Sequence, residues 1–81
     1  MGWNFTKMLY YLIMDTSKKI GDKIKEIRKK KKLTQVEVAE KAGIHFNYFA
    51  RLERGEVNPS IQTIESIANA LKVKSGDILF F

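Results

Sequence analysis

Apolar residues recur at intervals of three and four along most of the chain, which is the spacing of amphipathic α-helices. The pattern predicts helices over about 5–14, 18–31, 35–42, 46–54 and 61–71, and a short last turn over about 76–80. No run alternates apolar and polar residues as a half-buried strand does, and no internal repeat is present. The sequence therefore predicts an all-α fold.

Capping residues mark the ends of several of these helices. Thr34 and Glu37 form a T-x-x-E capping box before the 35–42 helix, and Gly43 can adopt a positive φ after it. His45 stands where the next helix needs its N-cap. The other expected caps and stops are the polar break of Asp15, Thr16 and Ser17, then Gly55, Ser60 and Ser75.

The helices predicted over 35–42 and 46–54 are joined by a tight turn. They carry small and apolar residues where two crossing helices would meet, at Val38, Ala39, Ala42, Gly43, Ile44, Phe49 and Leu52. This is the pattern of a helix-turn-helix, whose second helix enters the major groove of DNA. The pattern therefore favours sequence-specific DNA binding.

Residues 1–16 differ in composition from the rest of the chain. They hold several aromatic residues, and their apolar run over 8–14 is far too short to span a bilayer, which needs about 20 residues. The predicted amphipathic helix there must pack against the domain, a second subunit or a membrane surface. Alternatively, residues upstream of Met14 are an added extension. We divide the chain into an N-terminal amphipathic extension, 1–16, and a DNA-binding domain, 17–81.

Composition narrows the possible functions. The 81 residues predict one small domain, and domains of this size often gain stability from a partner subunit. A net charge of +6 favours an anionic partner, either nucleic acid or a membrane surface. The lysines of the 18–31 helix and the turn after it are expected to form a solvated face that speeds encounter with DNA.

The residue types argue against an enzyme. The chain has no cysteine and a single histidine, His45, and it shows neither a glycine-rich phosphate loop nor metal-ligand spacing. We therefore expect no catalytic residue, no cofactor, no metal site and no membrane span. The expected location is cytoplasmic.

The stretch LTQVEVAEKAGIHFNYFARLERGEVNPSIQTIESIANALKVKSGDIL resembles the Xre/Cro family of phage-repressor-like helix-turn-helix proteins. Five short motifs of the family occur here in the family's order. They are the T-Q-x-E-x-A opening, the A-G turn, the L-E-R-G ending, the N-P-S turn and the D-I-L close. The resemblance covers about 17–79. It implies a compact five-helix domain, to which the N-terminal extension is additional, and a homodimer that binds double-stranded DNA at a palindromic operator. The recognition helix resembles that of restriction–modification controller proteins in its residues His45, Asn47 and Tyr48.

The outward face of the second motif helix supplies the candidate base-reading residues. These are Phe46, Asn47, Ala50 and Arg51, which lie opposite the apolar face by 3.6-residue spacing. Arg51 can donate paired hydrogen bonds to guanine O6 and N7. Asn47 can either read adenine N6 and N7 or hold a phosphate. Phe46 departs from the family, which is usually polar here. It either touches a thymine methyl group or packs back onto the scaffold.

The candidate DNA-backbone contacts are Gln35, His45, Tyr48, Arg54 and Asn58. Gln35 lies in the first turn of its helix, where free N–H groups can hold a phosphate. The alternative is an exposed glutamine with no such contact.

The resemblance also implies a structural salt bridge between Arg28 and Glu53, which would fix the angle of the recognition helix. The alternative is two exposed charges that contribute little. Lys32 occupies a turn position that is often glycine in the family. It either adopts a left-handed conformation, at a cost of about 1–2 kcal/mol, or the turn is altered.

Two functions follow from these patterns. The first is a transcriptional regulator that binds operator DNA. The alternative is a protein–protein or membrane-surface adaptor that acts through the aromatic N-terminal helix. Phe80 and Phe81 are expected to meet that helix or a second subunit.

Overall fold

The structure, a computed structural model, describes residues 4–13 and 15–79, with residues 11–13 described by their backbone alone. In this part of the chain there are six α-helices and no strand, so the all-α prediction is confirmed. The helices are α1 (Phe5–Ile13), α2 (Thr16–Lys30), α3 (Gln35–Ala42), α4 (Phe46–Glu53), α5 (Ile61–Leu71) and α6 (Ser75–Leu79). Trp3, one of the aromatic residues of the N-terminal extension, lies outside the described residues, as do Met14, Phe80 and Phe81 with the expectations stated for them.

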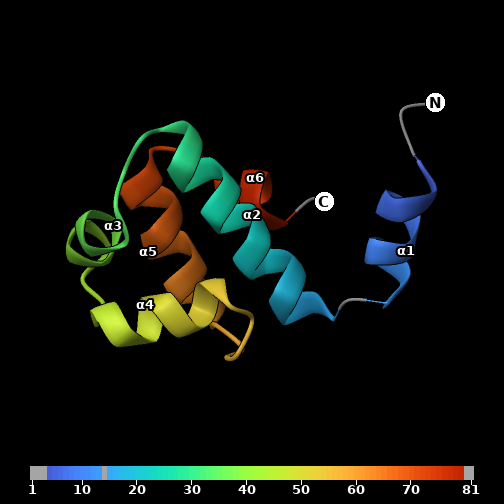
Figure 1. The fold of residues 1–81 in the computed structure, drawn as a ribbon. Coiled ribbons are helices and arrows are strands. Elements are labelled where there is room, and N and C mark those ends of the chain that lie inside the picture. The colour runs from blue at the N-terminus through green and yellow to red at the C-terminus, as the bar shows by residue number, and fades with distance from the viewer. Residues whose placement is uncertain (1–3, 14, 80–81) are drawn as a thin grey trace.

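Helices α2 to α6 gather around one hydrophobic core, and α1 stands apart beyond the N-terminal end of α2 (Figure 1). The core forms because each of the five helices buries one apolar stripe. Its largest fully buried side chains are Ile24, Val38, Phe49, Leu52, Ile67, Leu71 and Ile78. The helical spacing of 61–71 predicts one apolar face made of Ile61, Ile64, Ile67, Ala68 and Leu71. Ile61 is an exception, because it is 60% exposed.

The local capping signals define most helix ends. The Thr34 hydroxyl accepts a hydrogen bond from the backbone N–H of Glu37, at 3.1 Å. The Glu37 carboxylate in turn accepts one from the Thr34 N–H, at 2.8 Å. Gly43 ends α3 with a φ of +71°. Both halves of the predicted capping box and the left-handed glycine are therefore present.

Two predicted helix starts need correction, and one predicted cap is in its place but makes no side-chain hydrogen bond. Helix α2 begins at Thr16 and not Lys18, because the Asp15 carboxylate already accepts the Lys18 N–H at 2.9 Å. His45 occupies the N-cap position of α4, but its side chain makes no capping hydrogen bond. Ser75 is the first residue of α6 and not its cap, because the Asp77 carboxylate accepts the backbone N–H of Lys74.

Lys32 takes the left-handed conformation, with a φ of +58°. Its N–H donates to the Lys29 carbonyl, and the N–H of Leu33 donates to the Arg28 carbonyl. These two bonds satisfy carbonyls at the end of α2. They offset the strain of a non-glycine residue in this conformation.

Gly21 sets how closely α2 approaches α4. A Cβ atom on Gly21 would lie 2.4 Å from the carbonyl oxygen of Leu52 and 2.7 Å from that of Glu53. Both obstacles are backbone atoms, so no side-chain rotation could relieve the overlap. The absence of a side chain at this position therefore allows α4 to lie directly against α2.

We predict that Gly21→Ala destabilises the fold by about 2 kcal/mol, as overpacking in a core does. Alanine is otherwise favoured over glycine inside a helix, so the loss would report the steric contact. The thermal midpoint measured by circular dichroism should fall by about 8–16 °C. Lys25→Ala, at an exposed position of the same helix, serves as the control and should change the midpoint little. A midpoint that rises in Gly21→Ala would contradict the predicted overlap.

The capping box predicts a pH dependence of stability. The hydrogen bond from the Thr34 backbone lowers the pKa of the Glu37 carboxyl below its ordinary value of 4.5. The folded protein therefore binds this proton less readily than the unfolded chain does. The resulting stability is present above pH 4.5 and is lost as the pH falls through the folded-state pKa.

We accordingly expect the thermal midpoint to fall more between pH 7 and pH 4 in the wild type than in Glu37→Gln. Glutamine keeps an acceptor for the Thr34 N–H but does not titrate. Glu40→Gln on the same helix controls for the lost charge. Equal acid sensitivity in the wild type and Glu37→Gln would remove Glu37 as a source of the effect.

Candidate nucleic-acid interface

Helices α3 and α4 form the predicted helix-turn-helix. The turn is held by hydrogen bonds from the N–H of Gly43 to the Glu40 carbonyl, at 3.2 Å, and from the N–H of Ile44 to the Ala39 carbonyl, at 3.0 Å. On α4, Phe49 and Leu52 are fully buried, so the opposite face of this helix is turned to solvent. The turn and this buried face together orient α4 on the domain.

The outward residues of α4 are mostly where the sequence places them. His45, Asn47 and Arg51 are exposed. Phe46 is 43% exposed and does not belong to the residues packed on the core, so the structure favours its outward alternative. Ala50 is only 8% exposed, and its expected position on the open face is wrong.

Tyr48 is partly buried and packs against the core. It therefore supports α4 from the side and does not lie on the exposed face of this helix. Asn58, in the segment after α4, is exposed and accepts a hydrogen bond from the Ser17 hydroxyl. This bond links the exit of α4 to the first turn of α2.

Arg28 and Glu53 form the salt bridge that the family resemblance implied. Arg28 Nε donates to Glu53 Oε2 at 2.6 Å, and Arg28 Nη2 donates to Glu53 Oε1 at 3.0 Å. Arg28 Nη1 donates to the Leu33 carbonyl at 2.9 Å. The two residues are 8% and 3% exposed, so this is a buried bidentate pair and not two surface charges.

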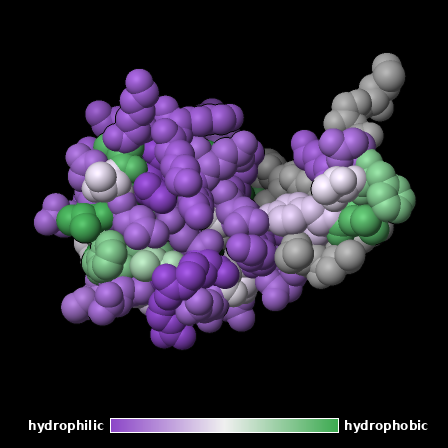
Figure 2. Space-filling model, viewed as in Figure 1, coloured by the Kyte–Doolittle hydropathy of each residue, from purple (hydrophilic) through white to green (hydrophobic). Residues whose placement is uncertain are grey.

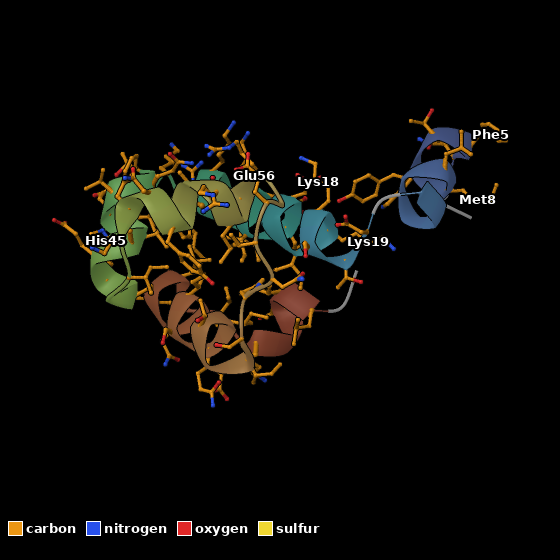
Figure 3. All side chains as sticks on the ribbon, turned by 90° about the horizontal axis from the view of Figure 1, so that it is seen from below. Phe5, Met8, Lys18, Lys19, His45 and Glu56 are labelled. Atoms are coloured by element: carbon orange, nitrogen blue, oxygen red, sulfur yellow. The ribbon has the colours of Figure 1, made fainter. Side chains whose placement is uncertain are left out.

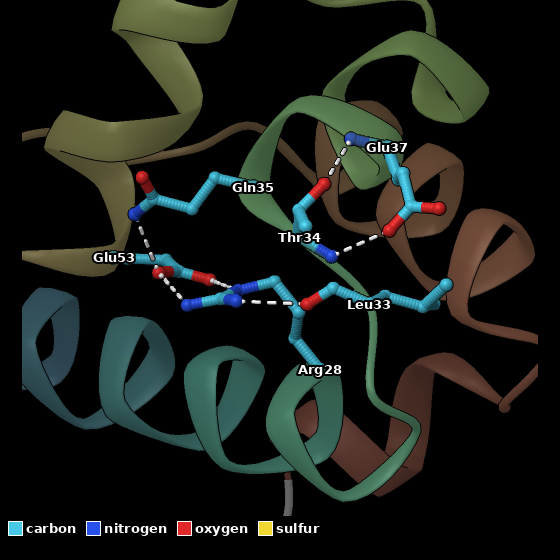
Figure 4. A network of polar contacts seen from close by, with 6 residues as sticks. All are labelled: Arg28, Leu33, Thr34, Gln35, Glu37 and Glu53. Carbon is cyan, nitrogen blue, oxygen red and sulfur yellow. Dashed lines mark hydrogen bonds and ion pairs between the residues drawn. The ribbon is translucent and has the colours of Figure 1, made fainter.

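Gln35 completes this network (Figure 4). Its Nε2 atom donates to Glu53 Oε1 at 2.9 Å, which links α3 to the α2–α4 pair. The sequence pattern did not indicate this contact, because 18 residues separate the partners. A side-chain amide nitrogen carries two hydrogens, so one remains for an outward contact.

Glu56 is a residue of the site that the sequence pattern did not single out. Its carboxylate accepts hydrogen bonds from Arg54 Nε at 2.7 Å, from Arg54 Nη2 at 3.4 Å and from Arg51 Nε at 3.4 Å. The bond from Arg54 lowers the pKa of Glu56 and raises that of Arg54. The signal in the sequence was an acid following two arginines just beyond the helix-ending Gly55.

The lysines of α2 form a solvated face, as expected. Lys18 pairs with Asp22 at 3.1 Å, and Glu26 pairs with both Lys23 at 3.4 Å and Lys30 at 3.6 Å. The surface seen in Figure 2 is largely hydrophilic over α2 to α5. Such exposed pairs contribute little stability, but the positive charge attracts an anionic partner.

Helix α1 is joined to the rest by a hydrogen bond from the Tyr10 hydroxyl to Asp22 Oδ2, at 2.8 Å. Among its apolar residues with described side chains, Phe5, Met8 and Leu9 do not pack on the core. Phe5 is 69% exposed, Met8 44% and Leu9 37%, and Figure 3 shows Phe5 and Met8 pointing away from the other helices. For these three residues, packing within the domain is not observed.

Over residues 4–13 and 15–79, no helix has the length and apolar character needed to cross a bilayer. The same part of the chain contains no group of three or more histidine, aspartate or glutamate side chains that could hold a metal ion. On and around α4, the polar side chains of His45, Asn47, Arg51 and Arg54 are exposed to solvent.

Comparison with known proteins agrees with this geometry. The helix-turn-helix family HTH_3 matches residues 24–78. The immunity repressor protein of Bacillus phage phi105 is 47% identical over 60 residues, which cover 74% of this chain and 42% of the repressor. The transcriptional regulator SinR of Bacillus subtilis is 41% identical over 61 residues, which cover 74% of this chain and 55% of SinR. The chain thus spans about half the length of these two relatives or less.

Among solved structures, the restriction-modification controller protein C.AhdI from Aeromonas hydrophila superposes with a TM-score of 0.75 at 31% sequence identity. The superposition covers 76% of this chain and 94% of the controller protein. A phage repressor and a restriction–modification controller are the two kinds of protein that the sequence motifs resemble. The chain therefore belongs to the Xre-like helix-turn-helix family, as those motifs predicted.

Proposed function

We propose that the chain regulates transcription by binding double-stranded DNA sequence-specifically, with α4 in the major groove. One observation carries this proposal. The inner face of α4 is held by the buried network of Arg28, Gln35 and Glu53, while its outer face exposes Asn47 and Arg51. Side chains of these two types can read base edges through paired hydrogen bonds.

The names of the relatives support regulation and not catalysis, since they are an immunity repressor, a transcriptional regulator and a controller protein. None of these names favours the adaptor alternative. A regulator of this kind acts where DNA is accessible, and we propose a cytoplasmic location.

The proposed base-reading residues are Phe46, Asn47 and Arg51. Ala50 could contribute only if neighbouring side chains moved, because it is 8% exposed. Phe46 offers an exposed ring that can contact a thymine methyl group. The proposed backbone contacts are Gln35, His45, Tyr48, Arg54 and Asn58.

Gln35 suits a phosphate contact for a geometric reason. It is the first residue of α3, where backbone N–H groups are free of helical partners. Its side chain is anchored through one N–H to Glu53, and the second N–H remains for an oxygen of the DNA backbone. The same residue thus connects the buried network to the proposed DNA surface.

We further propose that the protein binds a palindromic operator as a homodimer. Two-fold symmetry would place the recognition helices on half-sites about 34–36 Å apart, one helical turn of DNA. The exposed apolar residues of α1 support an additional contact with a second subunit.

The function is tested by titrating the protein onto a duplex recovered from a random-sequence pool by the wild type, and onto a scrambled duplex. We expect preference for the recovered duplex at two salt concentrations. Arg51→Ala should lose about 1–3 kcal/mol of discrimination, as expected for a bidentate base contact. Gln35→Ala should weaken both duplexes alike, because phosphates carry no sequence information.

Circular dichroism spectra of both variants establish that they are folded. Equal wild-type affinity for the two duplexes at moderate salt would overturn sequence-specific binding. A change in discrimination for Gln35→Ala as large as that for Arg51→Ala would contradict the assigned roles.

Assembly is tested by sedimentation velocity over a range of protein concentrations. We expect the mass to shift from monomer toward dimer as concentration rises, and to shift less in the double variant Phe5→Ser, Met8→Ser. A monomer mass that does not depend on concentration, with and without the recovered duplex, would refute the homodimer. Phospholipid vesicles added to the wild type test the adaptor alternative, for which binding would have to depend on α1.

A further inference from the structure

Glu56 is held in place by the turn that ends α4. Gly55 has a φ of +77°, and its N–H donates to the Leu52 carbonyl at 3.0 Å. The N–H of Glu56 donates to the Arg51 carbonyl, also at 3.0 Å. This pair of bonds is a Schellman motif, which fixes the backbone of Glu56 against the last turn of the helix that carries Arg51.

Helix α2 constrains the same turn from outside. A Cβ atom on Gly55 would lie 2.8 Å from the Cα atom of Lys18. The exit of α4 is therefore packed against the start of α2 as well as bonded to its own helix. Figure 3 shows His45 at one end of α4 and Glu56 at the other, beside Lys18. The backbone position of Glu56 thus depends on the fold and not on a bound partner.

The carboxylate of Glu56 contacts each arginine in a different way. It accepts Nε and Nη2 of Arg54, but only Nε of Arg51. Among the hydrogen bonds of the described residues, none uses the two terminal nitrogens of Arg51. Those are the two nitrogens that an arginine uses when it donates end-on to guanine O6 and N7.

We propose that Glu56 is a positioning residue that sets base discrimination by Arg51. It holds Nε of Arg51, so that the two terminal nitrogens face a guanine edge, and it keeps Arg54 beside them for a phosphate. This inference rests on the proposed function. Its physical basis is preorganisation, since a long side chain that is ordered before binding loses less conformational freedom when it binds.

Charge repulsion by Glu56 would have the opposite effect on DNA binding. An exposed carboxylate near DNA repels phosphates and competes for both arginines. Its removal would then strengthen binding to every duplex by a similar factor. Preorganisation instead acts at the one base pair that Arg51 reads. Loss of preorganisation would lower discrimination at that base pair, whereas loss of charge repulsion would leave discrimination there unchanged.

The expected size of the Glu56→Gln effect depends on how exposed the three charged side chains are. The side chains of Arg51, Arg54 and Glu56 are 55%, 57% and 45% exposed, so solvent and salt weaken their attraction. We expect Glu56→Gln to reduce discrimination at the Arg51 base pair by about 3-fold. Complete loss of the bidentate contact in Arg51→Ala should cost roughly 5- to 150-fold.

The experiment uses the full chain and the duplex recovered from a random pool by the wild type. Each G·C pair of that duplex is changed in turn to A·T, and affinities are measured by fluorescence anisotropy at fixed salt. The pair at which Arg51→Ala loses discrimination identifies the base that Arg51 reads. Glu56→Gln should lose discrimination at this pair and at no other, and Glu56→Asp, which keeps the charge, should retain part of it.

Two further variants separate positioning from a general charge effect. Glu65→Gln removes an exposed carboxylate from α5 and should leave discrimination unchanged. In the Arg51→Ala background, Glu56→Gln should have no additional effect at the identified pair, because Glu56 acts through Arg51. Thermal midpoints of all variants check that the fold is intact.

Three outcomes would overturn the inference. Glu56→Gln could strengthen binding to all duplexes equally, or lose discrimination at every pair, or change discrimination in the Arg51→Ala background as much as in the wild type. In each case the wild type would still prefer its recovered duplex, and the proposed function would stand. If the wild type binds DNA without preference, the proposed function fails and the inference fails with it.

Discussion

The buried pair of Arg28 and Glu53 determines how the recognition helix sits on the domain. Taking two charges out of water is unfavourable unless they are paired and their remaining hydrogen-bonding groups are satisfied. Here the guanidinium also donates to the Leu33 carbonyl, and the carboxylate also accepts from Gln35. In the part of the chain that the structure describes, every buried side-chain nitrogen or oxygen has a partner. Loss of either charge from such a pair typically costs about 3–5 kcal/mol.

The packing around this pair restricts α4 further. Gly21 brings α2 against the carbonyls of Leu52 and Glu53, next to the residue that receives the salt bridge. Helix α4 has only eight residues, and a helix of that length is not stable alone in water. Its conformation and its direction therefore both come from the contacts on its inner face. This constraint leaves the outer face free to carry residues chosen for binding.

The polar network continues from the interior to the proposed DNA surface. Gln35 bonds to the buried carboxylate of Glu53 and stands at the start of α3, and Glu56 joins Arg51 to Arg54 at the exit of α4. The residues proposed to bind DNA are thus supported by neighbours with fixed positions, as accurate recognition requires. Helix α1 lies outside this arrangement, since its described apolar side chains remain exposed.

The sequence by itself determined the helices and most of their ends, because those signals act over three to five residues. The capping box of Thr34 and Glu37 and the turn glycine Gly43 are examples. The sequence also identified Arg28 and Glu53 as partners, although only through the family resemblance. Tertiary structure alone decided that Gln35 bonds to Glu53, that Ala50 is covered and that Glu56 joins two arginines. The first two depend on the angle at which α4 packs on the other helices, and the third on the turn that follows α4. Periodicity along the chain specifies which face of a helix is apolar, but it does not specify which side chains of other elements that helix meets.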